Sequence, residues 1–176
     1  MAQLNSRDRL QPSLLDRLID SSPTEKLEGV DARVLSRQQL RAAVLRDLSW
    51  LLNATRAEPD EGSDRTDEVA LWAANGEARQ SVLNFGMPAF AGTTLSSMDA
   101  QAIERAVETA IRQYEPRIDP VTLNVSVRLG NEDTSLNIVQ ITIRGLLWSQ
   151  PVPLELLLSA DVDFETGHTQ VREVRA

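Results

Sequence analysis

Side chains that could carry metal or nucleophilic chemistry are scarce in this sequence. Cysteine is absent and the only histidine is His168, so thiolate nucleophiles, disulfides and zinc sites built from cysteine and histidine are excluded. A Ser-His-Asp triad would have to pair His168 with Asp161 or Asp163, yet the sequence has no G-x-S-x-G turn to expose a serine. We therefore predict that His168 lies in an exposed turn and has no catalytic role.

Phosphate-binding and sugar-cleaving patterns are equally weak. Gly86 and Gly92 are six residues apart with Thr93 next, which matches neither the P-loop nor the G-x-G-x-x-G turn. Glu104 and Glu108 share one helix face, as a glycosidase carboxylate pair might require, but the arginines beside them indicate a solvated charged face. The sequence predicts no catalytic residue, no metal site and no cofactor.

One segment does combine unusual features, the run Tyr114-Glu115-Pro116-Arg117-Ile118. Pro116 disfavours the helical conformation for Glu115, so a helix is predicted to end here, with Glu115 and Arg117 extending to opposite sides of a short stretch. Glu115 then lies at the negative end of the helix dipole, where a carboxylate needs a compensating cation. Two interpretations remain open: a helix stop with ordinary surface charges, or a recognition site.

Two long amphipathic helices are predicted to position this segment. Ser36 and Gln39 form a capping box that begins a helix running to about Asn53, and Ser96 and Asp99 open another that runs to about Tyr114. Apolar residues recur every four positions in both helices. Each helix is therefore expected to pack one face on a core.

A short capped helix is also predicted close to the N-terminus, with an apolar stripe that includes Leu14, Leu15 and Leu18. A polar linker follows it, and so short a helix is not stable alone. It must dock either on its own domain or on a partner. We predict an N-terminal arm over residues 1–34 and a single domain over residues 35–176.

Residues 55–80 are predicted to form an acidic loop inserted in this domain. Between Arg56 and Glu68 there are six acidic residues and two arginines, a net charge of −4, together with a proline and a glycine. This composition favours a solvated loop. The apolar residues 69–74 that follow are not assigned by any pattern.

The second half of the chain changes to a period of two. Strands are predicted over residues 121–129, 136–148 and 154–164, with a short, charged edge strand at 170–175. The apolar parity changes within the second strand, which indicates either a bulge or two covered faces. Helices first and an antiparallel meander of about four strands last predict an α+β fold.

The overall composition limits the possible partners. With 176 residues and a formal net charge of −8, the chain would repel a phosphate backbone, so nucleic acid is an unfavourable partner. The N-terminus lacks the apolar core of a signal peptide, and no run is long enough to span a bilayer. No basic amphipathic helix is present for anionic lipid. We expect a cytoplasmic protein without direct membrane binding.

Five segments of the chain, in order and spacing, resemble the TssE family of baseplate wedge proteins in bacterial type VI secretion systems. They are PSLLDRL (12–18), VLRDLSWLLN (44–53), SVLNFGMP (81–88), YEPRI (114–118) and VPLELLLSADVDFETG (152–167). The resemblance runs from about residue 12 to the C-terminus. It departs from the family mainly in the acidic insertion between Arg56 and Gln80.

The resemblance implies a structural role in a cytoplasmic, membrane-docked baseplate. The implied partners are TssF, TssG and TssK, at the foot of the contractile TssB/TssC sheath. In this family the marked motif is the segment here formed by Glu115, Pro116 and Arg117, associated with holding the wedge together. The implied fold is similar to the interlocking domain of the sheath protein, so an edge strand is expected to be exchanged with the first sheath ring.

Two alternatives to this role follow from the same residues. Phage relatives of the family are often labelled lysozyme-like, which would make the chain a peptidoglycan-cleaving enzyme, although no catalytic pair supports that. The other alternative is a generic cytoplasmic adaptor whose N-terminal helix docks in a partner groove through Leu14, Leu15 and Leu18.

Overall fold

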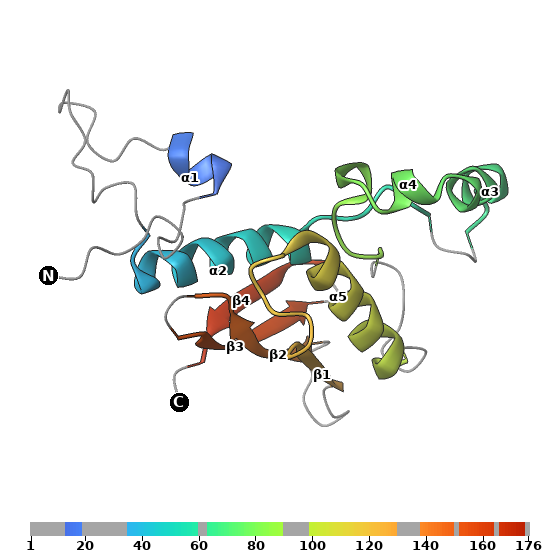
Figure 1. Cartoon of the computed structure of the whole chain (residues 1–176). Helices are drawn as coiled ribbons and strands as arrows, with labels where there is room; N and C mark the ends of the chain where they lie inside the picture. Colours follow the sequence, from blue (N-terminus) through green and yellow to red (C-terminus); the bar gives the residue numbers. More distant parts are fainter. Residues whose placement is uncertain are drawn as a thin grey trace, which may run out of the picture.

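The computed structural model of the chain describes residues 13–18, 35–59, 63–89, 99–129, 138–149, 152–163 and 166–174. Within these residues the fold is α+β, with helices packed on one face of a four-stranded antiparallel sheet (Figure 1). This arrangement confirms the predicted fold class. The proposed boundary at residue 34 and most of the arm before it lie outside the described residues.

The helices are α1 (Leu14–Leu18), α2 (Arg37–Asn53), α3 (Thr66–Ala74), α4 (Gly76–Arg79), the 3-10 helix η3 (Val82–Asn84) and α5 (Ala100–Tyr114). The predicted capping box begins α2: Ser36 Oγ accepts the Gln39 N–H at 3.2 Å, and Gln39 Oε1 accepts the Ser36 N–H at 2.8 Å. Asp99 caps α5 by accepting the N–H of Gln101 at 2.9 Å. None of the helices in the described part of the chain is long and apolar enough to cross a membrane.

The strands are β1 (Asn124–Leu129), β2 (Ile138–Leu147), β3 (Leu154–Asp163) and β4 (Thr169–Glu173), in the order β1-β2-β3-β4. Pairing with β3 runs without interruption along the whole of β2. The bulge that the sequence allowed is therefore absent from the described part of β2. β1 begins three residues later than predicted, because the residues before it form a turn that leaves Val121 90% exposed.

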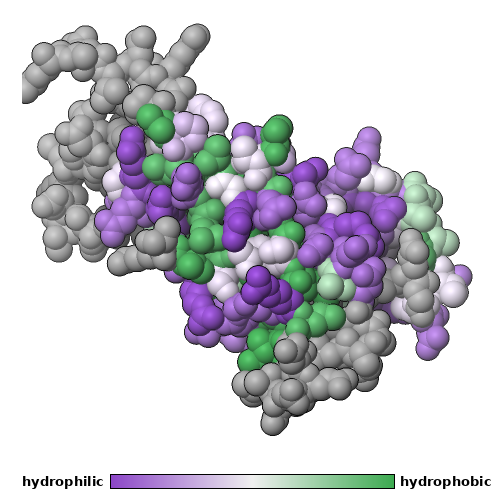
Figure 2. Space-filling view, turned by 90° about the horizontal axis from the view of Figure 1, so that it is seen from below, coloured by the Kyte–Doolittle hydropathy of each residue, from purple (hydrophilic) through white to green (hydrophobic). Residues whose placement is uncertain are grey.

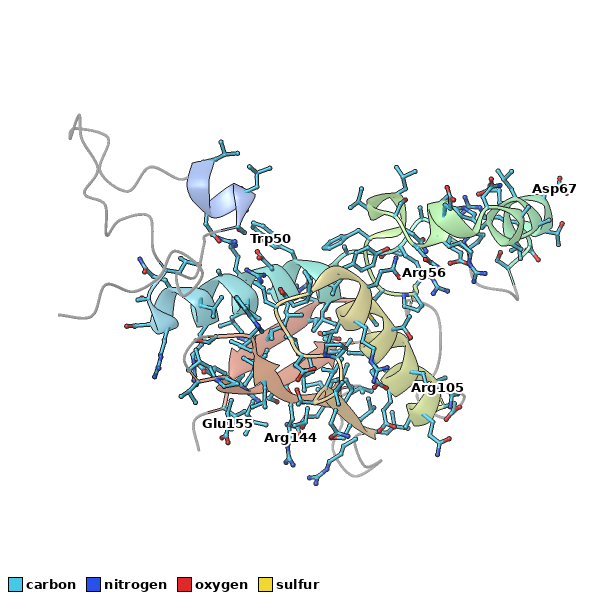
Figure 3. The ribbon with its side chains drawn as sticks, viewed as in Figure 1. Trp50, Arg56, Asp67, Arg105, Arg144 and Glu155 are labelled. Carbon is cyan, nitrogen blue, oxygen red and sulfur yellow. The ribbon has the colours of Figure 1, made fainter. Side chains whose placement is uncertain are left out.

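The core lies between the sheet and the two long helices. α2 packs against β4, α5 packs against β1, and the two helices touch each other. The members of this core with no exposed surface are Val44, Leu48, Val107, Ile111, Val139, Ile143, Leu147, Leu158 and Ala160. On the opposite face of the sheet no helix of the described residues packs: Arg144 and Glu155 project from it (Figure 3), and hydrophobic and hydrophilic side chains are interspersed there (Figure 2).

Side chains from the helices hydrogen-bond to both edge strands. On β4, the Asn53 amide donates to the Thr169 carbonyl at 2.8 Å and accepts the Thr169 N–H at 2.9 Å. On β1, Glu104 accepts the N–H of Val127 at 2.9 Å. Glu104 was expected on a solvated face, but its side chain binds the edge strand β1. Helices and loops often cover sheet edges in this way.

The predicted acidic loop over residues 55–80 needs a correction, because α3 and α4 lie inside it. Asp67 and Glu68 occupy the first turn of α3. Carboxylates at that position interact favourably with the positive end of a helix dipole. Acidic residues, which indicated a loop, are thus equally common in the first turn of a helix. The apolar residues 69–74, which no pattern assigned, form the rest of α3.

Candidate functional site at the end of helix α5

Glu115, Pro116 and Arg117 form a turn where α5 ends. The N–H of Ile118 closes this turn by donating to the Glu115 carbonyl at 3.2 Å. Arg117 Nε donates to Glu115 Oε1 at 2.6 Å, its backbone N–H donates to the same oxygen at 3.1 Å, and its Nη2 pairs with Glu115 Oε2. The prediction that the two side chains extend to opposite sides is wrong, because this segment is a turn and not extended chain.

Arg117 is held between two carboxylates from distant parts of the sequence. Its Nη2 also donates to Oδ2 of Asp47 on α2 at 2.6 Å. Burial alone would lower the pKa of Arg117, but the hydrogen bonds and charges of Glu115 and Asp47 outweigh it, and the pKa is raised above its ordinary value. Glu115 is only 3% exposed. Arg117 thus supplies the cation that a buried carboxylate at a helix C-terminus requires.

The network continues from Asp47 to α1 through Arg46. Arg46 Nε donates to Asp47 Oδ1 at 2.8 Å, and its Nη1 donates to Asp16 Oδ1 at 2.6 Å. The hydrogen bonds that Arg46 donates to Asp47 and then to Asp16 raise the pKa of Arg46. For Asp16, burial acts to raise the pKa, but the hydrogen bonds from Arg46 and Ser13 prevail and lower it. An unbroken chain of ion pairs therefore joins α1, α2 and the turn after α5.

This attachment leaves the apolar stripe of α1 uncovered. The exposed fractions of Leu14, Leu15 and Leu18 are 75%, 39% and 74%. The helix therefore contacts its own domain through Asp16, while its leucines face outward. The sequence left two possibilities open, docking of this helix on its own domain and docking on a partner. In the structure the polar side of α1 is bound to the domain, whereas its exposed leucines are accessible to a partner.

An apolar groove lies beside the turn. Its volume is about 550 Å³, and it contacts Asp47, Glu115 and Arg117 of the network as well as Ser13. The remaining residues that line it are apolar or aromatic: Leu35, Leu48, Trp50, Leu51, Phe85, Tyr114 and Pro116. Trp50 projects from α2 towards α1 (Figure 3), is 52% exposed, and has the Arg46 guanidinium carbon 5.2 Å from its ring centre. Such a cation over an aromatic face is attractive.

Tyr114 fixes the far wall of the groove. Its hydroxyl donates to the Ser81 carbonyl at 3.0 Å and accepts from Gln113 at 2.8 Å. Its ring meets Phe85 edge to face, with centroids 5.2 Å apart. Burial raises the pKa of Tyr114. The residue immediately before Glu115 is therefore locked to the segment that follows α4, and the groove is preformed.

The chemistry of this site suits recognition more than catalysis. Glu115 and Asp47 are both engaged by Arg117, so neither is placed as a free proton donor of the kind that glycosidases use. Within the described residues, no three potential metal ligands come together. His168 lies in the exposed connection between β3 and β4, as predicted. What remains is an apolar concavity with a fixed charged rim, which matches a binding surface.

Sequence reasoning found Glu115, Pro116 and Arg117 but missed Asp47 and Arg46. The structure brings all of these except Pro116 into one network, and Pro116 lines the adjacent groove. The leucines of α1 are joined to them only indirectly, through Asp16. The one available signal was the segment VLRDLSWLLN, which contains Arg46, Asp47 and Trp50, but nothing in it specified their partners.

A family described as "Baseplate wedge protein gp25" matches residues 38–152. This range covers α2 to β2, including the whole ion-paired turn and Asp47, and it is more than half of the chain. No curated protein and no solved structure matched. The chain therefore belongs to the gp25-like baseplate wedge family, whose members are structural proteins of contractile tails and injection systems.

Proposed function

We propose that this protein is the TssE-type wedge component of a type VI secretion baseplate. In this role it joins TssF, TssG and TssK to the base of the TssB/TssC sheath on the cytoplasmic side of the membrane. The family match supports a baseplate wedge protein. The five segments that resemble TssE support the specific system, and one of them carries Glu115, Pro116 and Arg117.

The observation that carries the proposal is the position of Arg117 at the rim of the apolar groove. Two carboxylates hold the guanidinium, with Nη2 only 2.6 Å from Asp47 Oδ2. Fixing a charged rim around an apolar concavity lowers the entropy lost when a partner docks. We assign the groove to an apolar segment of TssF or TssG, with Pro116 in its wall and Arg117 at its edge.

The exposed stripe of α1 extends this surface. Leu14 and Leu18 are about three-quarters exposed, and the same network that holds Arg117 also holds α1 through Asp16. An outward apolar stripe at helical spacing fits a helix-in-groove contact. We therefore assign Leu14, Leu15 and Leu18 to the same wedge interface as the ion-paired turn.

The sheath side of the protein is assigned to the edge of β4. The Val174 N–H donates to the Leu157 carbonyl on β3 at 2.9 Å, and hydrogen-bonding directions alternate along an antiparallel strand. Val171 and Glu173 therefore direct their backbone groups away from β3. These two residues offer the pairing positions for a strand of the first sheath ring.

The test is co-purification with TssF and TssG. Wild type is expected to form a stoichiometric complex, and Glu115→Ala and Arg117→Ala are expected to lose it while circular dichroism shows a folded domain. Arg105→Ala is the matched control, because the ion pair of Arg105 with Asp99 is exposed and lies outside the network of Arg117. If wild type binds neither protein, the proposal fails. If Arg105→Ala is as damaging as Arg117→Ala, the assignment of the site fails.

A further inference from the structure

The segment from Ser63 to Asn84, here called the α3 arm, carries apolar side chains that the domain does not cover. Leu71 is 63% exposed, Val82 is 80% exposed and Leu83 is 70% exposed. None of the nine residues of α3 is buried. The helix projects to one side of the sheet, and Asp67 lies at its far end (Figure 3). A helix this short is marginal without tertiary packing, so its exposed side needs a partner.

The base of the α3 arm is firmly attached, in contrast to its tip. The buried Asn84 amide donates to Glu58 Oε2 at 3.0 Å and to the Arg79 carbonyl at 3.2 Å, and it accepts the Glu58 N–H at 2.9 Å. Arg79 also pairs with Glu58 at 2.7 Å. The C-terminal end of the arm is therefore tied by side-chain bonds to Glu58, which precedes the arm in the sequence.

The backbone on either side of this tie is equally constrained. The Met87 N–H donates to the Ala54 carbonyl at 2.8 Å, and the Arg56 N–H donates to the Met87 carbonyl at 2.9 Å. Between these bonds Gly86 has φ +127°, and a Cβ there would lie 2.5 Å from the Ala54 oxygen. Only glycine permits this close approach. The arm thus leaves the domain from a defined base at the end of α2.

The charges of the α3 arm indicate what could cover it. Arg65 pairs with Glu68, but Asp64, Asp67 and Glu77 form no ion pair with any residue that the structure describes. All three are exposed. Apolar side chains flanked by uncompensated carboxylates are complementary to an apolar groove with a basic rim.

We infer that the α3 arm is a second docking surface, for a baseplate protein that offers an apolar groove rimmed by arginine or lysine. The inference rests on the proposed function for the choice of partner. A second copy of the chain is unfavourable here, because the net charge is −8 and the same carboxylates would face one another. The arm lies outside the groove next to Arg117, so one wedge protein would hold two partner surfaces at once.

The experiment uses the full-length chain with purified TssF, TssG and TssK. In the wild-type complex, amide exchange over residues 63–83 is expected to slow at least about tenfold relative to the free chain. Leu71→Asp and Asp67→Lys are each expected to weaken the complex about tenfold. Val121→Asp and Glu155→Lys are the controls, since they make the same changes of charge at exposed sites outside the arm.

The outcomes separate this inference from the proposed function. If the wild-type complex forms while arm exchange stays fast and Leu71→Asp binds normally, the arm is not a docking surface and the proposed function stands. If wild type binds none of the three proteins, the proposed function fails and the partner assigned to the arm fails with it. If sedimentation shows a dimer that Leu71→Asp abolishes, a second copy occupies the arm and the assignment is overturned. Unfolding of the Leu71→Asp domain would make the arm part of the fold and would also overturn it.

Discussion

Arg117 and Asp47 are 70 positions apart in the sequence, yet Nη2 of the first lies 2.6 Å from Oδ2 of the second. The contact ties the turn after α5 to the flank of α2, the other helix on the same face of the sheet. Because Arg117 also holds Glu115, the conformation of the turn depends on a residue far from it in sequence.

Replacing Arg117 by methionine separates its structural role from its binding role. The change leaves Glu115 buried without a cation, which should lower the free energy of unfolding by about 2–3 kcal/mol, so a domain of ordinary stability stays folded. In the double variant Glu115→Gln/Arg117→Met both charges are gone, and we expect at least half of that loss to be recovered in urea unfolding. Neither variant should bind TssF and TssG. If the double variant bound TssF and TssG, the charges of the turn would be needed only for the stability of the domain and not for contact with the partners.

Asp47→Asn should disconnect the turn from Arg46. We expect a loss of about 1–2 kcal/mol in the free energy of unfolding, since a charge-assisted bond to a partly buried guanidinium is weakened. Asp99→Asn is a suitable control: asparagine still caps α5, and the exposed Asp99–Arg105 pair at 3.4 Å should contribute less than about 0.5 kcal/mol. Equal effects of the two changes in urea titrations would contradict the proposed importance of Asp47.

The attachment of α1 should depend on pH in one direction only. The pKa of Asp16 is lowered in the folded protein from an ordinary value of 3.8, so its ion pair with Arg46 contributes fully above that value and is lost as the pH falls through the folded pKa. Trp50 fluorescence, recorded in a Trp72→Phe/Trp148→Phe background, should be constant from pH 8 to about pH 5 and change only in stronger acid.

The matched control for this titration is Asp16→Asn, which should give the released Trp50 signal at every pH. Far-ultraviolet circular dichroism at each pH separates release of α1 from unfolding of the domain. A Trp50 transition near neutral pH, or an unchanged signal in Asp16→Asn, would show that the Asp16–Arg46 pair does not hold α1.

Charging the α1 stripe should affect binding and not stability. Leu14→Asp and Leu18→Asp replace side chains that are 75% and 74% exposed, so the free energy of unfolding should change by less than about 0.5 kcal/mol. Affinity for the TssF–TssG complex, measured by calorimetry, should fall about tenfold. Val121→Asp, at a 90% exposed site, should leave affinity unchanged, and normal binding of both leucine variants would remove α1 from the interface.

Glu173→Pro tests the β4 edge. Proline removes the backbone N–H, which at Glu173 is directed away from β3, so the β3–β4 ladder should persist while an added strand loses a donor. Glu173→Ala is the control, because it removes only the side-chain pair with Arg41. We expect Glu173→Pro, but not Glu173→Ala, to abolish co-sedimentation with assembled TssB/TssC sheath. Loss in both would assign the effect to the Arg41 pair.

The parts of the fold that could be predicted from the sequence are those with local determinants. The capping box of Ser36 and Gln39 lies within four residues, and the alternation in β1 needs only its own side chains. The class and the order of the elements follow from such patterns. The turn at Pro116 was predicted as extended because proline restricts the residue before it, whereas the closing bond from Ile118 to Glu115 depends on the residues after it.

The candidate site was predictable only in part, because its geometry depends on contacts between distant residues. The position of Glu115 at the C-terminal end of a helix indicated that a cation must lie near its carboxylate, and Arg117 supplies this cation. No local rule places Asp47 opposite Arg117, or Arg46 beside Asp16, since these pairings arise only when α1, α2 and the turn after α5 come together. The apolar groove is a property of the same assembly.

Asn53 sets a limit on strand exchange at the β4 edge. Its carboxamide has the same donor and acceptor as a peptide group, and it already occupies both backbone groups of Thr169. A strand arriving at this edge must therefore stop short of Thr169 and pair only around Val171 and Glu173. Because so few residues can pair, the contact made by a single copy of the protein is expected to be weak and reversible. In the proposed attachment to a sheath ring, many such joints would act together, so the attachment would be strong through avidity and could still be released one subunit at a time.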